Sequence, residues 1–338
     1  MEKRMILENL KAYYRQLKGT TEYFVKAVDG VSLEIYEGDI LGLVGESGCG
    51  KSTLAKTMMM DLTPPLQYMG GRLEIISRDG KSFEISQFKN RDEVKRKLWG
   101  KHIAYVPQDA LNALMPTIKI KKIAYDVLRS HDKNISFQKA VEIAKERLIE
   151  LDLPDYVVEL YPFQLSGGMR QRAVLAMATL LNPEILIVDE PTSALDVTTQ
   201  KIVLKSLIKL RKLGFVDSIV FITHDISTVR QIANRIAVMY AGKIVEVGPT
   251  ESIIREPLHP YTQGLINSVA SIEPEGREKG LSYIPGQPPN LMDPPSGCRF
   301  HPRCPYAMEI CRKEEPKLLK VGESQVACWL YQEGGENV

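Results

Sequence analysis

A short loop near the start of the chain has the residue types of a phosphate-binding site. Residues 45–52 are Gly-Glu-Ser-Gly-Cys-Gly-Lys-Ser, which fits the pattern G-x-x-x-x-G-K-[ST]. The glycines let backbone N–H groups turn toward phosphate oxygens, while Lys51 brings positive charge and Ser52 a hydroxyl ligand for Mg²⁺. The apolar run 40–44 predicts a strand before the loop, and residues 52–60, free of Gly and Pro, predict a helix after it. This context favours a functional loop over a chance match. The residues expected to contact nucleotide are Gly45, Ser47, Gly48, Cys49, Gly50, Lys51, Ser52 and Thr53.

Further polar side chains follow predicted strands. The apolar run 185–188 ends in Asp189 and Glu190, and Gln108 ends the run 103–106. A carboxylate at the C-terminal edge of a parallel sheet can hold Mg²⁺ through water, and a second one can orient or deprotonate an attacking water. His224 ends another apolar run, 219–222. Alone, each of these residues has a structural explanation, and their common position after strands favours catalysis.

The elements that must position these residues alternate between strands and helices. This order predicts an α/β fold with a mostly parallel sheet. Residues 72–76 and 82–85 predict a hairpin across Asp79-Gly80, and 235–240 with 243–247 predict a second. The positively charged stretch 89–101 favours a solvated helix face over a binding patch. Prolines become frequent after Pro249, and we place a domain boundary near residue 257.

Composition restricts the class of protein. The chain has 338 residues, 44% hydrophobic and 25% charged, which suggests about two domains of ordinary globular composition. The net charge of +2 gives no nucleic-acid footprint, so we expect no nucleic-acid partner. No apolar run reaches the roughly 18 residues of a membrane span. The acidic, polar start does not fit a signal peptide, so we expect a cytoplasmic location.

One further motif makes the resemblance to a known family specific. Leu165-Ser166-Gly167-Gly168-Met169 resembles the signature loop of ATP-binding cassette (ABC) transporter ATPases. The phosphate loop and four further motifs also match motifs of this family, in the same order along the chain. The four are Gln108, Asp189-Glu190, Ser193-Ala194-Leu195-Asp196 and Thr223-His224-Asp225. Met169 stands where much of the superfamily has Gln, which is typical of the importers for oligopeptides, dipeptides and nickel. Residues 259–262, His-Pro-Tyr-Thr, and the tail from Ile284 to Cys298 resemble the same subgroup.

The resemblance implies a P-loop NTPase core over residues 1–256, with an antiparallel β subdomain and a helical subdomain over about 109–182. Residues 257–338 would form the extension typical of oligopeptide transporters. Glu190 would be the catalytic base, with His224 and Gln108 beside it. Mg²⁺ would be held by Ser52, Gln108 and Asp189. Tyr23 would stack on adenine, with Phe24 as the alternative and core packing open for both.

The resemblance also implies partners. Two cassettes would form a head-to-tail dimer, so Ser166, Gly167, Gly168 and Met169 would face the partner's ATP and Asp196 would lie at the interface. The second cassette would be a paralogue or a second copy. Two transmembrane permease subunits and an extracytoplasmic solute-binding protein would complete the importer, with this chain peripheral on the cytoplasmic face of the membrane.

Four of the five cysteines lie in the extension, at Cys298, Cys304, Cys311 and Cys328. In a reducing compartment such a cluster indicates metal rather than disulfides. Their spacing differs from the C-x₂-C pairs of zinc ribbons, and four thiolates suit zinc or an iron–sulfur cluster. Resemblance to some peptide-importer ATPases favours a four-iron–four-sulfur cluster, ahead of zinc and of a metal-free tail.

We therefore expect an ATPase that powers uptake of oligopeptides or dipeptides. Oligosaccharide or nickel uptake is the nearest alternative. A soluble ABC ATPase of DNA repair or translation is a different class, but such proteins usually carry long coiled-coil insertions or two cassettes, and neither is present.

Overall fold

The computed structural model describes residues 2–193, 195–268 and 284–332. The chain divides into two compact units, which are described separately below. The first unit contains Met1–Arg4, Ile35–Asp39 and Ile75–Ile222. The second contains Met5–Glu34, Ile40–Glu74 and Thr223–Val338. In the described part of the chain, no helix is long and apolar enough to cross a membrane.

A parallel sheet is the centre of the first unit. Strand β7 (Ile185–Asp189) lies between β6 (Ile103–Val106) and β8 (Ser218–Thr223) and is parallel to both. Every residue of β7 and β8 is buried, which explains why their sequences are continuously apolar rather than alternating. Val188 pairs with both Val106 and Phe221, so the three strands end at one edge of the sheet.

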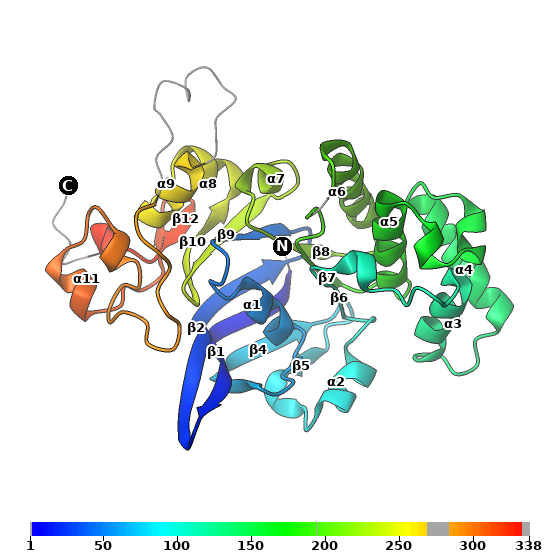
Figure 1. Cartoon of the computed structure of the whole chain (residues 1–338), viewed down its shortest axis with the longest axis horizontal. Helices are drawn as coiled ribbons and strands as arrows, with labels where there is room; N and C mark the ends of the chain where they lie inside the picture. The colour runs from blue at the N-terminus through cyan, green and yellow to red at the C-terminus, as the bar shows by residue number, and fades with distance from the viewer. Residues whose placement is uncertain (1, 194, 269–283, 333–338) are drawn as a thin grey trace. The chain divides into compact units, whose positions relative to one another are not determined.

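Helices make up most of the rest of this unit. In Figure 1, α3, α4 and α5 lie together as a helical group, all within the segment 109–182 predicted to be helical. Helix α4 buries one apolar face, because Ala140, Ala144 and Leu148 recur at helical spacing and are all fully buried. The α helices of this unit are α2 (Arg91–Lys97), α3 (Ile120–Arg129), α4 (Phe137–Glu150), α5 (Gly167–Ala178) and α6 (Val197–Lys212).

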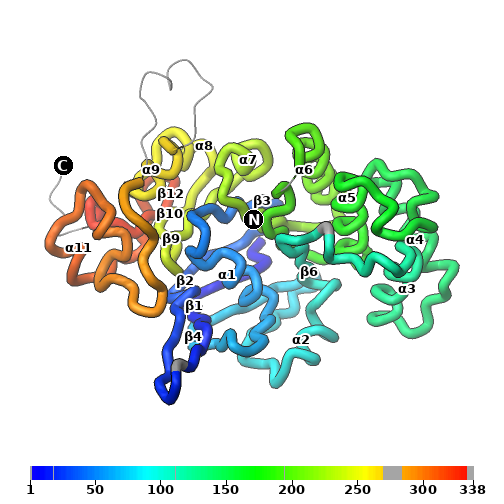
Figure 2. The backbone as a smooth tube through the Cα atoms, viewed as in Figure 1, coloured from blue at the N-terminus to red at the C-terminus, as the bar shows by residue number. Residues whose placement is uncertain are grey.

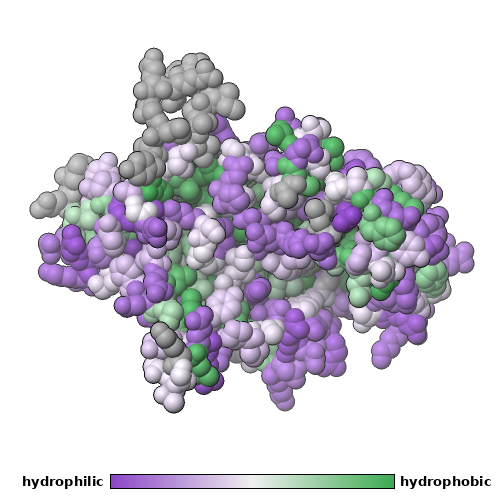
Figure 3. All heavy atoms as spheres, viewed as in Figure 1, coloured by the Kyte–Doolittle hydropathy of each residue, from purple (hydrophilic) through white to green (hydrophobic). Residues whose placement is uncertain are grey.

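The charged stretch before β6 forms α2, as a solvated helix. Asn90 caps it by accepting a hydrogen bond from the Glu93 N–H, and only Val94 of the helix is buried. Figure 3 shows hydrophilic side chains over this part of the surface. The predicted hairpin before it is also present, because β5 (Ser82–Glu84) neighbours β4 (Leu66–Ile76) and the Ser77 N–H donates to the Lys81 carbonyl.

The second unit contains two sheets. One contains β2 (Thr21–Tyr36), β1 (Lys3–Lys18) and β4 in this order, and β5 follows β4 as its fourth strand. The two-residue connection between β1 and β2 makes that pair antiparallel. The other has the order β11-β12-β10-β9-β3. Here β3 (Ile40–Val44) is parallel to β9 (Arg235–Tyr240), and β9 pairs antiparallel with β10 (Lys243–Pro249), as the hairpin pattern predicts.

The extension completes this second sheet. Strand β12 (Ser324–Val326) pairs antiparallel with β10, and β11 (Leu319–Val321) pairs antiparallel with β12. The sheet of this unit is mixed, because β3 and β9 are parallel whereas β9 and β10 form the predicted antiparallel hairpin. The extension adds two further antiparallel strands and satisfies the edge of β10. Figure 2 shows α8 (Thr250–Arg255) beside β9 and β10. Among the described residues of this unit, the other α helices are α1 (Lys51–Met58), α7 (Ile226–Arg230), α9 (Pro260–Asn267) and α11 (Glu309–Lys313).

Candidate functional site

The phosphate loop connects β3 to α1 in the second unit, as the motif requires. A Cβ atom at Gly45 would lie 2.1 Å from the Met239 carbonyl oxygen, and one at Gly50 would lie 2.0 Å from the Ala27 carbonyl oxygen. Gly50 also has φ +111° and caps α1, a conformation that side chains oppose. These two positions accept only glycine, so the loop has the tight cradle that a phosphate site needs. The structure thus fits bound ATP.

Lys51 is the cation of this loop. Its Nζ donates to the Gly45 carbonyl oxygen at 2.7 Å and to the Glu46 carbonyl oxygen at 3.0 Å, and the residue is only 7% exposed. The amino group therefore lies inside the curve of the loop. Its N–H groups donate there to backbone oxygens, and they could donate to phosphate oxygens instead. Cys49 is buried as well, and this burial raises the pKa of its thiol.

The other predicted nucleotide contacts differ in exposure. Ser47 and Gly48 are exposed at the tip of the loop, while Ser52 is half-buried at the start of α1. Thr53 is buried, and its Oγ1 lies 3.2 Å from the hydroxyl of Tyr14, which sequence inspection did not single out. Tyr23, on β2, is 37% exposed. The ring of Phe24 instead lies near that of Tyr13, with the two ring centroids 6.4 Å apart.

The edge of the parallel sheet in the first unit carries the predicted metal and base residues. Asp189 ends β7 and is 1% exposed, and the Tyr105 hydroxyl donates a hydrogen bond to its Oδ2 at 3.1 Å. Tyr105 was missed in the sequence, although its place in the strand before Gln108 could have indicated it. This hydrogen bond orients the Asp189 carboxylate at the edge of the sheet.

Glu190 and Gln108 are brought together at this edge. The Gln108 Nε2 donates to the Glu190 Oε2 at 3.2 Å, and the Glu190 N–H donates to the Ile222 carbonyl oxygen at 2.8 Å. Glu190 has φ +46°, an uncommon left-handed conformation for a side-chain-bearing residue. Such strain concentrates at functional sites, where surrounding contacts maintain it. Here Ser193 helps, because its N–H and Oγ both donate to the Glu190 carbonyl oxygen.

The signature residues form a helix N-terminus in the same unit. Ser166 caps α5, its Oγ accepting from the Met169 N–H at 3.3 Å. Ser166 and Gly167 are exposed, while Gly168 and Met169 are half-buried. An exposed start of a twelve-residue helix offers N–H groups and a positive dipole end to an anion from outside the chain.

Asp196 and His224 also lie next to helix starts. Asp196 is exposed and caps α6, since its two carboxylate oxygens accept from the N–H and hydroxyl of Thr199; these hydrogen bonds lower the pKa of Asp196. Its structural task is therefore established independently of any interface. Ala194, in the same motif, lies outside the described residues. His224 is exposed and directly precedes Asp225, the cap of α7, in the second unit.

The four cysteines of the extension are free thiols within the described range 284–332. The Cys298 N–H donates to the Cys311 carbonyl oxygen at 2.8 Å, and Cys311 and Cys328 are buried. Burial, with a smaller contribution from neighbouring thiols of the four, raises the pKa of Cys298 to about 11 and that of Cys328 to about 12. No group of three His, Cys, Asp or Glu residues that could hold a metal ion exists in the described part of the chain.

Comparison with known proteins agrees with these motifs. Residues 28–193 match the family model "ABC transporter", and residues 245–311 match "Oligopeptide/dipeptide transporter, C-terminal region". The dipeptide transport ATP-binding protein DppD of Caldanaerobacter subterraneus subsp. tengcongensis is 44% identical over 97% of both chains. The oligopeptide transport ATP-binding protein OppD of Bacillus subtilis is 42% identical over 90% of this chain and 84% of that protein.

A solved structure is similar too. The ATP-binding cassette MJ0796, as a dimer in a post-hydrolysis state with ADP and Pi, superimposes with a TM-score of 0.60 and 26% identity, covering 73% of this chain and 98% of that one. The predicted family resemblance is confirmed by all three comparisons. The chain belongs to the ABC transporter family of ATP-binding proteins, and it is an ATPase of that family with the C-terminal region of oligopeptide/dipeptide transporters.

Proposed function

We propose that this chain is the ATP-hydrolysing subunit that powers import of oligopeptides or dipeptides through an ABC transporter. The observation that carries the proposal is the pairing of an intact ATPase motif set with a C-terminal region of the oligopeptide/dipeptide type. The cassette alone would fit import of many solutes. Relatives of nearly full length named for dipeptide and oligopeptide transport narrow the cargo to peptides.

In this proposal each motif residue has one role in ATP binding or hydrolysis. The loop residues Gly45 to Thr53 bind the phosphates, with Lys51 turning from its own loop carbonyls to the β- and γ-phosphates. Ser52, Gln108 and Asp189 hold Mg²⁺, which when bound offsets the negative charge of the phosphates. Glu190 accepts a proton from the attacking water, and His224 keeps the reacting groups in line. Tyr23 stacks on the adenine ring.

A second cassette completes the site. Ser166, Gly167, Gly168 and Met169 form an exposed helix start, which we assign to the γ-phosphate of the partner's ATP. Asp196 would lie at this interface through its outer face, while it caps α6. The partner is a paralogue or a second copy, and the dimeric state of the similar cassette MJ0796 supports pairing of this kind.

The transporter would include two permease subunits and an extracytoplasmic solute-binding protein. This chain would be peripheral on the cytoplasmic face of the membrane. Within it, we assign nucleotide binding to residues 1–256, including the helical segment 109–182, and a separate extension to residues 257–338.

We further assign an iron–sulfur cluster to Cys298, Cys304, Cys311 and Cys328. Support comes from the family resemblance and from the hydrogen bond between the Cys298 N–H and the Cys311 carbonyl oxygen, which joins two of the four cysteine residues. Among the described residues, no group of three His, Cys, Asp or Glu side chains could hold a metal ion. The order of preference, an iron–sulfur cluster ahead of zinc, therefore rests on the family resemblance.

Two experiments test these assignments. Pull-down of the tagged chain from native membranes, followed by identification of the co-purifying proteins, should recover two permeases, and reconstitution should give ATP hydrolysis stimulated by peptide with its binding protein. Recovery without permeases, or stimulation by nickel or oligosaccharide but no peptide, would contradict peptide import. Anaerobic purification with iron, sulfide and zinc analysis tests the cluster, and stoichiometric zinc without sulfide would overturn it.

A further inference from the structure

The segment between Cys298 and Cys304 contacts the phosphate loop. Arg303, which directly precedes Cys304, donates from Nη1 to the Glu46 Oε2 at 2.7 Å and from Nη2 to the Glu46 Oε1 at 3.0 Å. Glu46 is the second residue of the phosphate loop. A bidentate arginine–carboxylate pair is among the strongest and most directional contacts between side chains. The extension is thus bound to the loop by an ion pair across 257 residues of sequence.

Arg303 is held in place before it meets Glu46. Its side chain is 6% exposed, its Nε donates to the Pro285 carbonyl oxygen at 2.7 Å, and its Nη1 also lies 3.3 Å from the Tyr240 hydroxyl. Hydrogen bonding to Glu46 raises the pKa of Arg303 above its ordinary value, so the guanidinium stays charged. A buried, oriented cation of this kind is pre-organised for one carboxylate.

The backbone of Glu46 is held by the same region. Its N–H donates to the hydroxyl of Tyr261 at 2.8 Å. Tyr261 is fully buried, and its ring packs against Tyr240 and Phe300 with centroids 4.5 and 5.4 Å away. Main chain and side chain of Glu46 are therefore both positioned by residues that follow every ATP motif in the sequence.

The charge of Glu46 makes this contact matter for nucleotide. A carboxylate in a phosphate-binding loop opposes the approach of phosphate anions and competes for the nearby cation. That cation is Lys51, whose Nζ already lies 3.0 Å from the Glu46 carbonyl oxygen. With Arg303 paired to it, the Glu46 carboxylate is neutralised and turned toward the extension, which leaves Lys51 available for phosphate.

We propose that Arg303 is a positioning residue for ATP binding, acting through Glu46 to keep the phosphate loop electrostatically open to nucleotide. This role rests on the proposed binding of ATP at residues 45–53. It also assigns a task to the segment 299–303 beyond its place between two cysteines, because the conformation of this segment determines where the guanidinium lies.

The test measures affinity of the full chain for the magnesium complex of adenylyl imidodiphosphate by isothermal titration. We expect Arg303→Met to weaken binding about tenfold, since it removes a charge-assisted pair and leaves an unpaired anion in the loop. Glu46→Gln in that background should restore the affinity to within about threefold of the original, because the anion is gone. A merely structural role of Arg303 predicts no such rescue.

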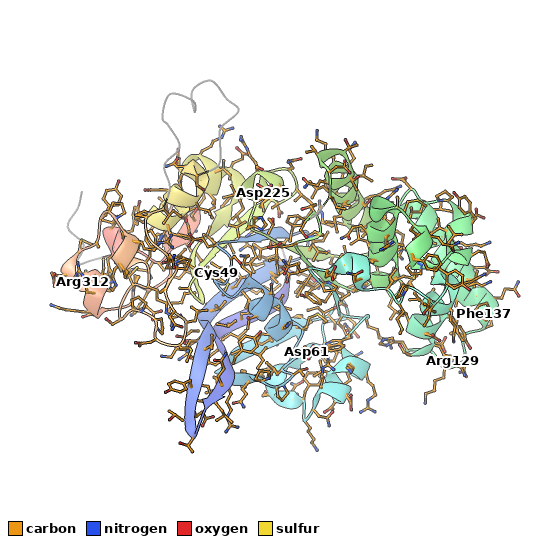
Figure 4. The ribbon with its side chains drawn as sticks, viewed as in Figure 1. Cys49, Asp61, Arg129, Phe137, Asp225 and Arg312 are labelled. Atoms are coloured by element: carbon orange, nitrogen blue, oxygen red, sulfur yellow. The ribbon has the colours of Figure 1, made fainter. Side chains whose placement is uncertain are left out.

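Arg312→Met is the matched control. Arg312 lies in α11 of the same extension, is 58% exposed and is far from Cys49 of the loop in Figure 4. It should leave both affinity and thermal unfolding unchanged. If Arg303→Met does not fold, Arg303→Lys takes its place, because it keeps the charge but loses the bidentate fork; we expect a smaller weakening that Glu46→Gln again removes.

The outcomes separate this inference from the proposed function. Failure of the unaltered chain to bind the nucleotide would overturn the ATP site itself. Normal binding by the unaltered chain with equal binding by the Arg303 variant, or with a double variant as weak as the single one, would overturn the role of Arg303 alone.

Discussion

The Gln108 side-chain amide donates to the Glu190 carboxylate over 3.2 Å, joining the ends of two neighbouring parallel strands. Glu190 is held at this point in a left-handed backbone conformation, with its N–H bonded to Ile222 of the third strand. Glu190, which we assign as the base, is therefore held through both its side chain and its backbone. One of its oxygens accepts from an amide, and the geometry directs the group to the edge of the sheet where ligands of such folds bind.

This arrangement predicts the effect of Glu190→Gln. The amide keeps the shape of the side chain but cannot accept a proton from water, so kcat should fall about 100-fold or more. The affinity for MgATP should stay within about twofold, because the phosphate loop is unchanged. Single-turnover hydrolysis and nucleotide titration, both with the partner cassette present, check the two values. Unchanged hydrolysis would remove Glu190 from the catalytic role.

Tyr105→Phe should affect the metal rather than the nucleotide. It removes the hydroxyl that donates to Asp189 at 3.1 Å, leaving a nearly isosteric ring. We expect the Mg²⁺ concentration for half-maximal hydrolysis to rise about three- to tenfold, as for loss of a hydrogen bond to a metal-ligating group. Tyr156→Phe, at a 58% exposed tyrosine of the same unit, is the control. An unchanged Mg²⁺ requirement in Tyr105→Phe would separate Asp189 from the metal.

The local elements around the motifs were predictable from sequence because their physical causes are local. Continuous apolar runs predict β7 and β8, and the glycine pattern predicts the strand–loop–helix around Lys51. Parallel strands end at one edge, which explains why Gln108 and Glu190 meet although 82 residues separate them.

Contacts from the extension could not be predicted in this way. The pairing of Arg303 with Glu46, and of Tyr261 with the same residue, depends on how β10 and the segments after it fold back onto the phosphate loop. Neither residue type nor spacing encodes that approach. Distance in sequence led us to treat the cysteine segment as separate from the ATP motifs, and the structure places its arginine on the loop. The added strands β11 and β12 were missed for a similar reason, since three-residue strands leave almost no periodic signal.

The composite site predicts that hydrolysis depends on protein concentration. Ser166 is exposed and caps the N-terminus of α5. In our proposal this helix N-terminus binds the ATP of another cassette. The isolated chain should therefore hydrolyse ATP slowly, with specific activity that rises as the chain or its partner is concentrated. Measuring specific activity against dilution, with light scattering to follow the oligomeric state, checks this. Full activity in a demonstrated monomer would contradict the shared site.

His259 predicts how the second unit responds to acid. It is 1% exposed and caps α9, its Nδ1 accepting from the Tyr261 N–H at 3.0 Å. Burial lowers the pKa of His259 from its ordinary value of 6.5 to about 3. Between pH 6.5 and pH 3 the unfolded chain therefore binds a proton at this histidine that the native chain does not. The contribution of His259 to the free energy of unfolding is fully present above about pH 6.5. It falls by about 1.4 kcal/mol per pH unit as the pH drops from there toward 3.

His259→Asn isolates this contribution, because asparagine caps a helix start but does not titrate near neutrality. Glu246 accepts from the His259 N–H, and burial raises its pKa, so its protonation opposes the acid loss in both proteins. Urea unfolding at several pH values from 7.5 to 5 measures the free energy of unfolding of both proteins. Over this range the original chain should lose about 2 kcal/mol more of it than the variant does. Parallel stability curves would show that His259 is not linked to protons, and that the acid response of this unit arises from other groups.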